Sequence, residues 1–169
     1  AGACDVLVEA SKSAKHAGLR FNIVSAMCKL AESEEGRASL VAAGACGALV
    51  EALETSEEDD TRCSIAYTMT SFAESEQGRT SLISGGACGA LVEALKVAHD
   101  IHTIRNIAKA TSNLAQNKEG CASLVAAGAC GALVEAMKIV EDDSPKLSIA
   151  GAMYLLSQSK EGRASLVAA

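Results

Sequence analysis

A 42-residue internal repeat is the feature that most constrains the fold of this chain. The segment EGRASLVAAGACGALVEAL at 35–53 returns as EGCASLVAAGACGALVEAM at 119–137. The triplet GAC recurs every 42 residues, at Gly2, Gly44, Gly86 and Gly128. A fixed period of this size is typical of a solenoid, in which each unit buries its apolar face only against its neighbours. We therefore expect residues 1–169 to form one repeat array, which starts at the second helix of one unit and ends after the first helix of another.

The first half of each unit predicts two short helices. Ser33 is a favourable N-cap, and the helix after it should end at Gly44, because a residue without Cβ suits the left-handed position that closes a helix. A second helix follows at once. Its apolar side chains, Leu49, Val50 and Leu53, have the spacing of one buried helical face.

The second half of each unit predicts a longer third helix after the acidic loop 55–60. Ile65, Met69 and Phe72 recur at the spacing of a buried stripe. In the last unit Ser144 and Pro145 read as an N-cap followed by proline at the first helical position. Asp60 and Thr61 hold the matching places, so we expect this third helix to begin there.

Composition limits which fold classes and which kinds of partner are possible. Aromatic residues are only 2% of the chain, so the core must consist of small aliphatic side chains at close helix spacing, which favours an all-α fold. The formal charge is -6 and the basic residues are scattered, whereas nucleic-acid binding needs a clustered basic surface. No uninterrupted apolar run approaches the roughly 18 to 20 residues of a membrane span. We expect neither a nucleic-acid partner nor a membrane span.

The cysteines indicate buried thiols and not a disulfide framework. Four of the seven occupy one repeat position, namely Cys4, Cys46, Cys88 and Cys130. Packed helices hold such positions about 8 to 10 Å apart, beyond the reach of about 7 Å that a disulfide needs. We expect them to be reduced, which indicates a reducing compartment such as the cytoplasm, the nucleus or an organelle.

Catalytic and metal-binding patterns are weak. His99 and His102 flank Asp100, but no third ligand recurs nearby, and the acidic runs 57–60 and 141–143 lack the glycine pattern of a calcium loop. A serine recurs in every unit without a histidine or carboxylate partner, at Ser39, Ser81, Ser123 and Ser165. A nucleophile needs one assembled site, so we predict no enzyme, no metal and no cofactor.

Two short helices and one longer helix in 42 residues resemble the armadillo repeat, with HEAT repeats as the close alternative. The passage GACGALVEAL after Gly44 is similar to the family's second-helix motif, with Gly47, Gly89 and Gly131 where the family often has proline. The resemblance covers the whole chain. It implies a right-handed α-solenoid whose third helices form a concave face.

Armadillo arrays use an asparagine ladder and tryptophans on that concave face to hold an extended peptide. The asparagine position corresponds here to Lys29, Ser71, Asn113 and Leu155, and the tryptophan position to Ser25, Tyr67, Lys109 and Gly151. One helical turn before the tryptophan position lie Asn22, Ser64, Asn106 and Ser148. The candidate partner-binding residues are therefore Asn22, Lys29, Ser64, Tyr67, Ser71, Asn106, Lys109 and Asn113. Asn106 and Asn113 should contribute most.

Two functional hypotheses follow from this resemblance. In the first, the chain is a non-enzymatic scaffold that binds a protein or an extended peptide on the concave face or at the array ends. In the second, it is a structural spacer within a larger assembly and binds no ligand in the groove. Leu166 and Val167 match interior residues of earlier units, so we also expect head-to-tail self-association or contact with neighbouring subunits at the ends.

Overall fold

The computed structural model describes residues 2–14 and 16–169, which form helices and no strand. Residue 1, at the start of the expected array, lies outside the described residues. The first helices of the units are α3 (Glu34–Ala42), α6 (Glu76–Ser84), α9 (Lys118–Ala126) and α12 (Lys160–Ala168). The second helices are α1 (Ala3–Ser13), α4 (Ala45–Glu54), α7 (Ala87–Val97) and α10 (Ala129–Ile139). The third helices are α2 (Ala17–Leu30), α5 (Asp59–Phe72), α8 (Ile101–Ala115) and α11 (Asp143–Leu156). The predicted all-α solenoid is confirmed.

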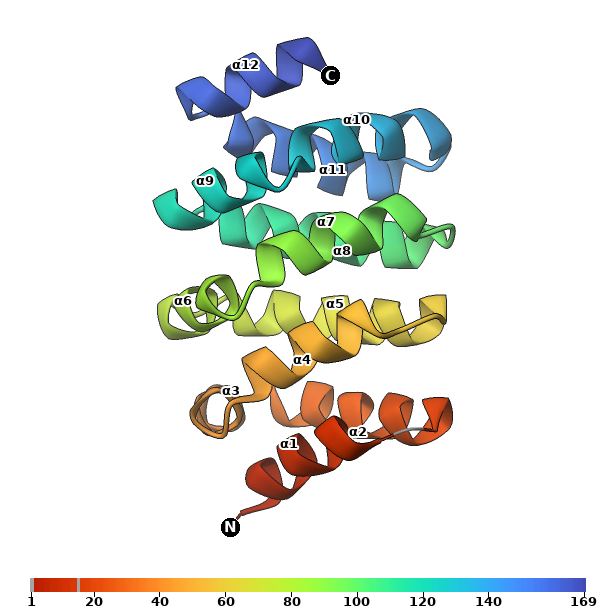
Figure 1. Ribbon diagram of the computed structural model, residues 1–169, viewed down its shortest axis with the longest axis vertical. Coiled ribbons are helices and arrows are strands. Elements are labelled where there is room, and N and C mark those ends of the chain that lie inside the picture. Colours follow the sequence, from red (N-terminus) through yellow and green to blue (C-terminus); the bar gives the residue numbers. More distant parts are fainter. Residues whose placement is uncertain (1, 15) are drawn as a thin grey trace.

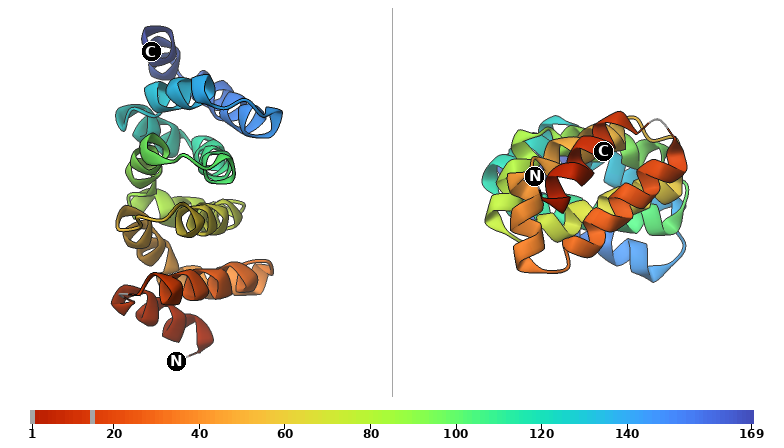
Figure 2. Two further views of the ribbon diagram at one scale, coloured as in Figure 1. Left: turned by 90° about the vertical axis from the view of Figure 1, so that its right-hand side faces the viewer. Right: turned by 90° about the horizontal axis from the view of Figure 1, so that it is seen from below.

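The units stack along one axis, with the two chain ends at opposite ends of the stack (Figure 1). The third helices lie on one side, and the first and second helices lie on the other (Figure 2). Each third helix packs against the third helix of the next unit, α2 on α5, α5 on α8 and α8 on α11. The buried residues form one continuous apolar cluster along the array, as expected for units that cannot bury their cores alone.

The turn between the first and second helices confirms the predicted caps. The Ser33 hydroxyl accepts a hydrogen bond of 3.0 Å from the amide of Gly36. Gly44 has φ of 85°, and the helices on either side of it meet at 77°. Gly86 and Gly128 have the same left-handed conformation, which glycine adopts without a steric penalty.

The third helices begin two residues earlier than predicted. Their N-cap positions are Glu58, Asp100 and Asp142, whereas the sequence favoured Asp60 and Ser144. Pro145 therefore occupies the third helical position, which is still in the first turn, where an amide hydrogen has no partner within the helix. Asp100 is the clearest cap, because its carboxylate accepts a hydrogen bond of 2.8 Å from the amide of Thr103.

A second glycine position, which the sequence interpretation missed, lets the first helix approach the end of the third. A Cβ on Gly36, Gly78, Gly120 or Gly162 would lie 1.9 to 2.2 Å from the carbonyl oxygen of the residue six positions earlier. Those carbonyls belong to Leu30, Phe72, Leu114 and Leu156. Only glycine fits such a contact, which fixes how the third helix of one unit passes into the first helix of the next.

All seven cysteines are free, and three of the four repeated ones are fully buried. The thiols of Cys88 and Cys130 lie 3.9 Å and 3.8 Å from the carbonyls of Gly120 and Gly162 in the next first helix. Cys4 is half-buried, in the first described helix. The expected burial of the repeated thiols is thus confirmed for the interior units.

We predict that Cys46 and Cys88 react slowly with a thiol reagent in the folded protein and rapidly in denaturant. Burial raises the pKa of Cys46 to about 12 and that of Cys88 to about 11, from 9.0.

Above pH 9.0 the unfolded chain therefore loses these two thiol protons while the folded chain keeps them, so the free energy of unfolding should fall as pH rises toward 12. Urea titrations across this range test the effect, with the double substitution C46A/C88A as control. An equal pH dependence in the control, or rapid labelling of both thiols in the folded protein, would contradict it.

Among the described residues, no single helix has both the length and the apolar character to cross a membrane. The pairs α3 with α4 and α9 with α10 meet the criteria of length and composition only together, with bends of 77° and 74°.

Candidate functional site

The candidate site is the outward surface of α2, α5, α8 and α11, which we call the third-helix face. Four predicted residues are exposed on it, Asn22, Lys29, Tyr67 and Lys109. Ser64, Ser71 and Asn113 are half-buried between neighbouring helices. Side chains from successive units therefore share this surface because the 42-residue period returns each of them to an equivalent helical position.

Asn106 is a correction to the predicted site. Its side chain is only 4% exposed, so it cannot offer its amide to a ligand on the third-helix face. The amide nitrogen instead donates to Cys63, 3.2 Å from the sulfur and 3.5 Å from the carbonyl oxygen. Asn106 therefore holds α8 against α5. The sequence could not predict this role, because it depends on how the two helices pack against each other.

Asn113 also contributes to the contact between α5 and α8, but its side-chain oxygen can still accept a hydrogen bond. Its amide nitrogen donates to the Thr70 carbonyl at 3.3 Å. The amide oxygen of Asn113 has no hydrogen bond in the described part of the chain. It is half-buried at the boundary of the third-helix face, where it can accept a hydrogen bond from a backbone amide of a ligand.

The N-terminal end of the α5–α8 contact is held by polar groups. Asp59 accepts hydrogen bonds from the backbone amides of His99 and Asp100 at 3.2 and 3.1 Å. Burial opposes ionisation of Asp59, but these bonds and that from Arg62 outweigh it and lower its pKa. Thr103 adds a bond of 3.1 Å to the Asp59 carbonyl. The middle of the array is therefore a fixed platform.

The third helices differ in net charge from the rest of the protein. Its four helices contain six basic residues (Arg20, Lys29, Arg62, Arg105, Lys109 and Lys146) and three acidic ones (Asp59, Asp60 and Asp143), although the whole chain has a charge of -6. Lys29 donates to Glu32 at 2.7 Å, and this bond raises the pKa of Lys29. The exposed Lys109 has no ion pair within the described residues.

The polar groups beside the lysines are mainly acceptors. The hydroxyls of Ser64 and Ser71 donate to carbonyls of their own helix, those of Asp60 and Tyr67, at 3.1 and 3.4 Å. Their oxygen lone pairs remain for a ligand. The exposed aromatic side chains of the third helices include Tyr67 on α5, which is 46% exposed, with Phe21 on α2 and Tyr154 on α11. The surface thus combines exposed lysines, hydrogen-bond acceptors and amphipathic tyrosine rings.

The histidine pair of the sequence analysis lies at the start of α8, where Asp100 is engaged as the cap of that helix. Within the described residues, no group of three or more histidine, cysteine, aspartate or glutamate side chains could hold a metal ion.

Comparisons with solved structures place this architecture among repeat proteins. No family profile and no curated protein matches the chain. A crystal structure of an engineered protein from a structural genomics consortium has a TM-score of 0.88 at 22% identity, over 99% of this chain and 69% of the other. A designed armadillo repeat protein in complex with the peptide (KR)4 has a TM-score of 0.85 at 23% identity, over 99% and 70%. Computationally designed armadillo repeat proteins for modular peptide recognition give 0.87 at 24%, over the same shares. The chain therefore has the armadillo-type repeat fold.

Proposed function

We propose that the chain is a non-enzymatic protein-binding scaffold that holds an extended segment of a partner along the third-helix face. The observation that carries the proposal is the exposed row formed by Lys29, Tyr67 and Lys109, which lie on successive third helices. Designed proteins of the same fold bind peptides, which supports this kind of ligand. The face spans about 10 Å per packed unit, so a segment of roughly ten to twelve extended residues matches it.

Charge indicates which segment would fit. A designed protein of this fold binds a basic peptide, but the third helices of this chain have twice as many basic as acidic residues. Lys29 and Lys109 attract carboxylates, and the ring of Tyr67 between their helices offers apolar contact. The proposed ligand is therefore a segment with acidic side chains near both lysines, and its backbone amides donate to Asn113 and the serines.

The test compares two fluorescent twelve-residue peptides, one with alternating glutamate and one with alternating lysine, by fluorescence anisotropy. We expect the acidic peptide to bind and the basic one not to bind. The substitutions K29E/K109E should weaken binding about tenfold, because each reversed surface charge changes the interaction by up to about 1 kcal/mol. The matched control is K12E/K138E, which reverses two exposed lysines on second helices and should leave the affinity within about twofold.

The outcomes separate the two hypotheses. Binding of the acidic peptide that K29E/K109E removes and K12E/K138E retains supports the groove. Equal losses in both variants would show a general charge effect and no site. If neither peptide binds, the spacer hypothesis is favoured, and contacts are then to be sought at the ends, where Val6 and Val167 are 59% and 89% exposed.

A further inference from the structure

An arginine recurs at one position of the first helices and is replaced by cysteine in the third unit. The position is occupied by Arg37, Arg79, Cys121 and Arg163. Each arginine bonds the end of the preceding third helix, with Nη1 2.8 to 2.9 Å from the carbonyl oxygens of Ala31, Ala73 and Ser157. The same nitrogen lies 3.2 to 3.5 Å from the next carbonyls, those of Glu32, Glu74 and Gln158. The guanidinium thus supplies donors to carbonyls that the helix itself leaves unpaired.

In the third unit the same carbonyls lack this donor. Cys121 is too short to reach the carbonyl oxygens of Ala115 and Gln116, and within the described residues neither of them accepts a hydrogen bond. The C-terminal end of α8 carries the negative end of its helix dipole, which favours a cation. This helix end therefore keeps the acceptors of the arginine site without the arginine.

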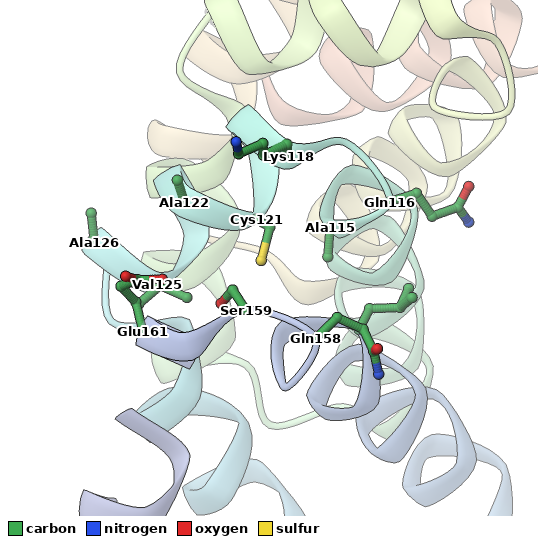
Figure 3. Close-up of a pocket in the computed structure, with 11 residues that line it drawn as sticks. Ala115, Gln116, Lys118, Cys121, Ala122, Val125, Ala126, Gln158, Ser159 and Glu161 are labelled. Atoms are coloured by element: carbon green, nitrogen blue, oxygen red, sulfur yellow. The ribbon is translucent and has the colours of Figure 1, made fainter. Parts of the chain in front are cut away.

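A cavity occupies the space beside these carbonyls. Its volume is about 620 Å³, and it lies between the α8–α9 turn and the α11–α12 turn of the next unit. The Cys121 side chain, which is 7% exposed, points into it from α9 (Figure 3). The apolar part of the wall includes Ala122, Val125 and Leu155, and this surface suits the methylene stem of a long side chain.

The polar groups around the cavity fit a guanidinium. Glu161 contributes a carboxylate to the wall, and the side-chain nitrogen of Gln158 is engaged with the Tyr154 carbonyl at 3.4 Å, which leaves its oxygen as an acceptor. Ser159 donates to Leu156, and its oxygen also accepts from the Gly162 amide. Lys118, the cation of the wall, is exposed at the rim and opposes a second cation there.

We propose that this cavity binds the arginine side chain of a protein partner, whose guanidinium takes the place that Arg37 and Arg79 fill in the first two units. The chain's own geometry identifies the occupant, since three units already hold a guanidinium on the equivalent carbonyls. The site lies at the edge where third helices pass into first helices, and it does not depend on the third-helix face.

The test titrates the 169-residue chain with arginine blocked at both ends and with blocked citrulline, its uncharged isostere. We expect blocked arginine to shift the amide NMR signals of Gln116 and Asn117 and to protect Cys121 from alkylation, which mass spectrometry measures for each cysteine. Blocked citrulline should bind about tenfold more weakly, because hydrogen bonds to a charged group are stronger than neutral ones. Equal affinity for the two would overturn the proposed charge recognition.

Variants decide whether the cavity is the binding site. Cys121→Arg should fill the cavity, abolish binding and raise the melting temperature by about 2–4 °C. Cys121→Ala keeps the carbonyls and the cavity and should bind normally. Arg79→Cys should create a second site and change the stoichiometry from one to two. Binding that persists in Cys121→Arg, or no binding to the wild-type chain and Cys121→Ala, would overturn the proposal. If sedimentation shows a dimer that Cys121→Arg dissociates, the occupant is a second copy, contrary to the proposal.

Discussion

Replacing Gly78 by alanine is expected to lower the free energy of unfolding by about 3 kcal/mol or more, at the upper end of the range for overpacking. The new Cβ would lie 2.0 Å from the Phe72 carbonyl oxygen and 2.8 Å from its carbon. Both atoms are backbone, so no side-chain rotation relieves the contact, and α6 must move away from the end of α5. Chemical denaturation followed by circular dichroism measures the change.

Gly47 provides the matched control. It is a helical glycine of the neighbouring unit, and a Cβ built on it meets nothing within 4 Å. Gly47→Ala should stabilise the protein by about 0.5 kcal/mol, because alanine is the better helix former. If Gly78→Ala were as stable as Gly47→Ala, the close approach of the first helix to the third would be wrong.

The second large effect is expected for Phe72→Ala, at about 3–5 kcal/mol, the range for loss of a buried phenylalanine. Phe72 is fully buried and is among the largest side chains of a core made mostly of alanine, leucine and isoleucine. It lies at the end of α5, where this third helix meets α6, the first helix of the next unit, so its removal opens a cavity at the junction of two units. The urea midpoint of the variant measures the loss.

Leucine is the natural control at this position. Leu114 and Leu156 occupy the equivalent place in the last two units and are also fully buried. Phe72→Leu should therefore cost only about 1 kcal/mol, because the site accepts a smaller apolar side chain with limited repacking. Equal destabilisation by alanine and leucine would mean that the loss arises from the aromatic ring itself and not from the cavity.

The repeat could be interpreted from the sequence because each of its parts has a local cause. Ser33 caps the helix that follows it through a contact three residues away, and Gly44 turns the chain through its own backbone conformation. Neither effect needs a distant partner. The start of the third helix was predicted two residues late, because several acidic and polar residues in succession can serve as a cap and the docking of the helix selects one.

The candidate site could be predicted only in part. The resemblance to the armadillo repeat assigned Lys29, Tyr67 and Lys109 to one face, and all three are exposed on the third helices. It assigned Asn106 to the same face, but the approach of α8 to α5 turns that amide toward Cys63. A rotation of a helix by a fraction of a turn separates an exposed side chain from a buried one, and only the contact between two helices determines it.

The sequence by itself determined the period and the positions that repeat, because both follow from the recurrence of the same residues. It also determined the three-helix unit, because helix caps and apolar spacing depend on neighbours within a few residues. The replacement of a recurrent arginine by Cys121 is also visible in the sequence. That this change leaves two helix-end carbonyls without a donor beside a cavity was decided by the tertiary structure. The reason is that the cavity joins residues of α8, α9, α11 and α12, whose separation depends on how one unit stacks on the next.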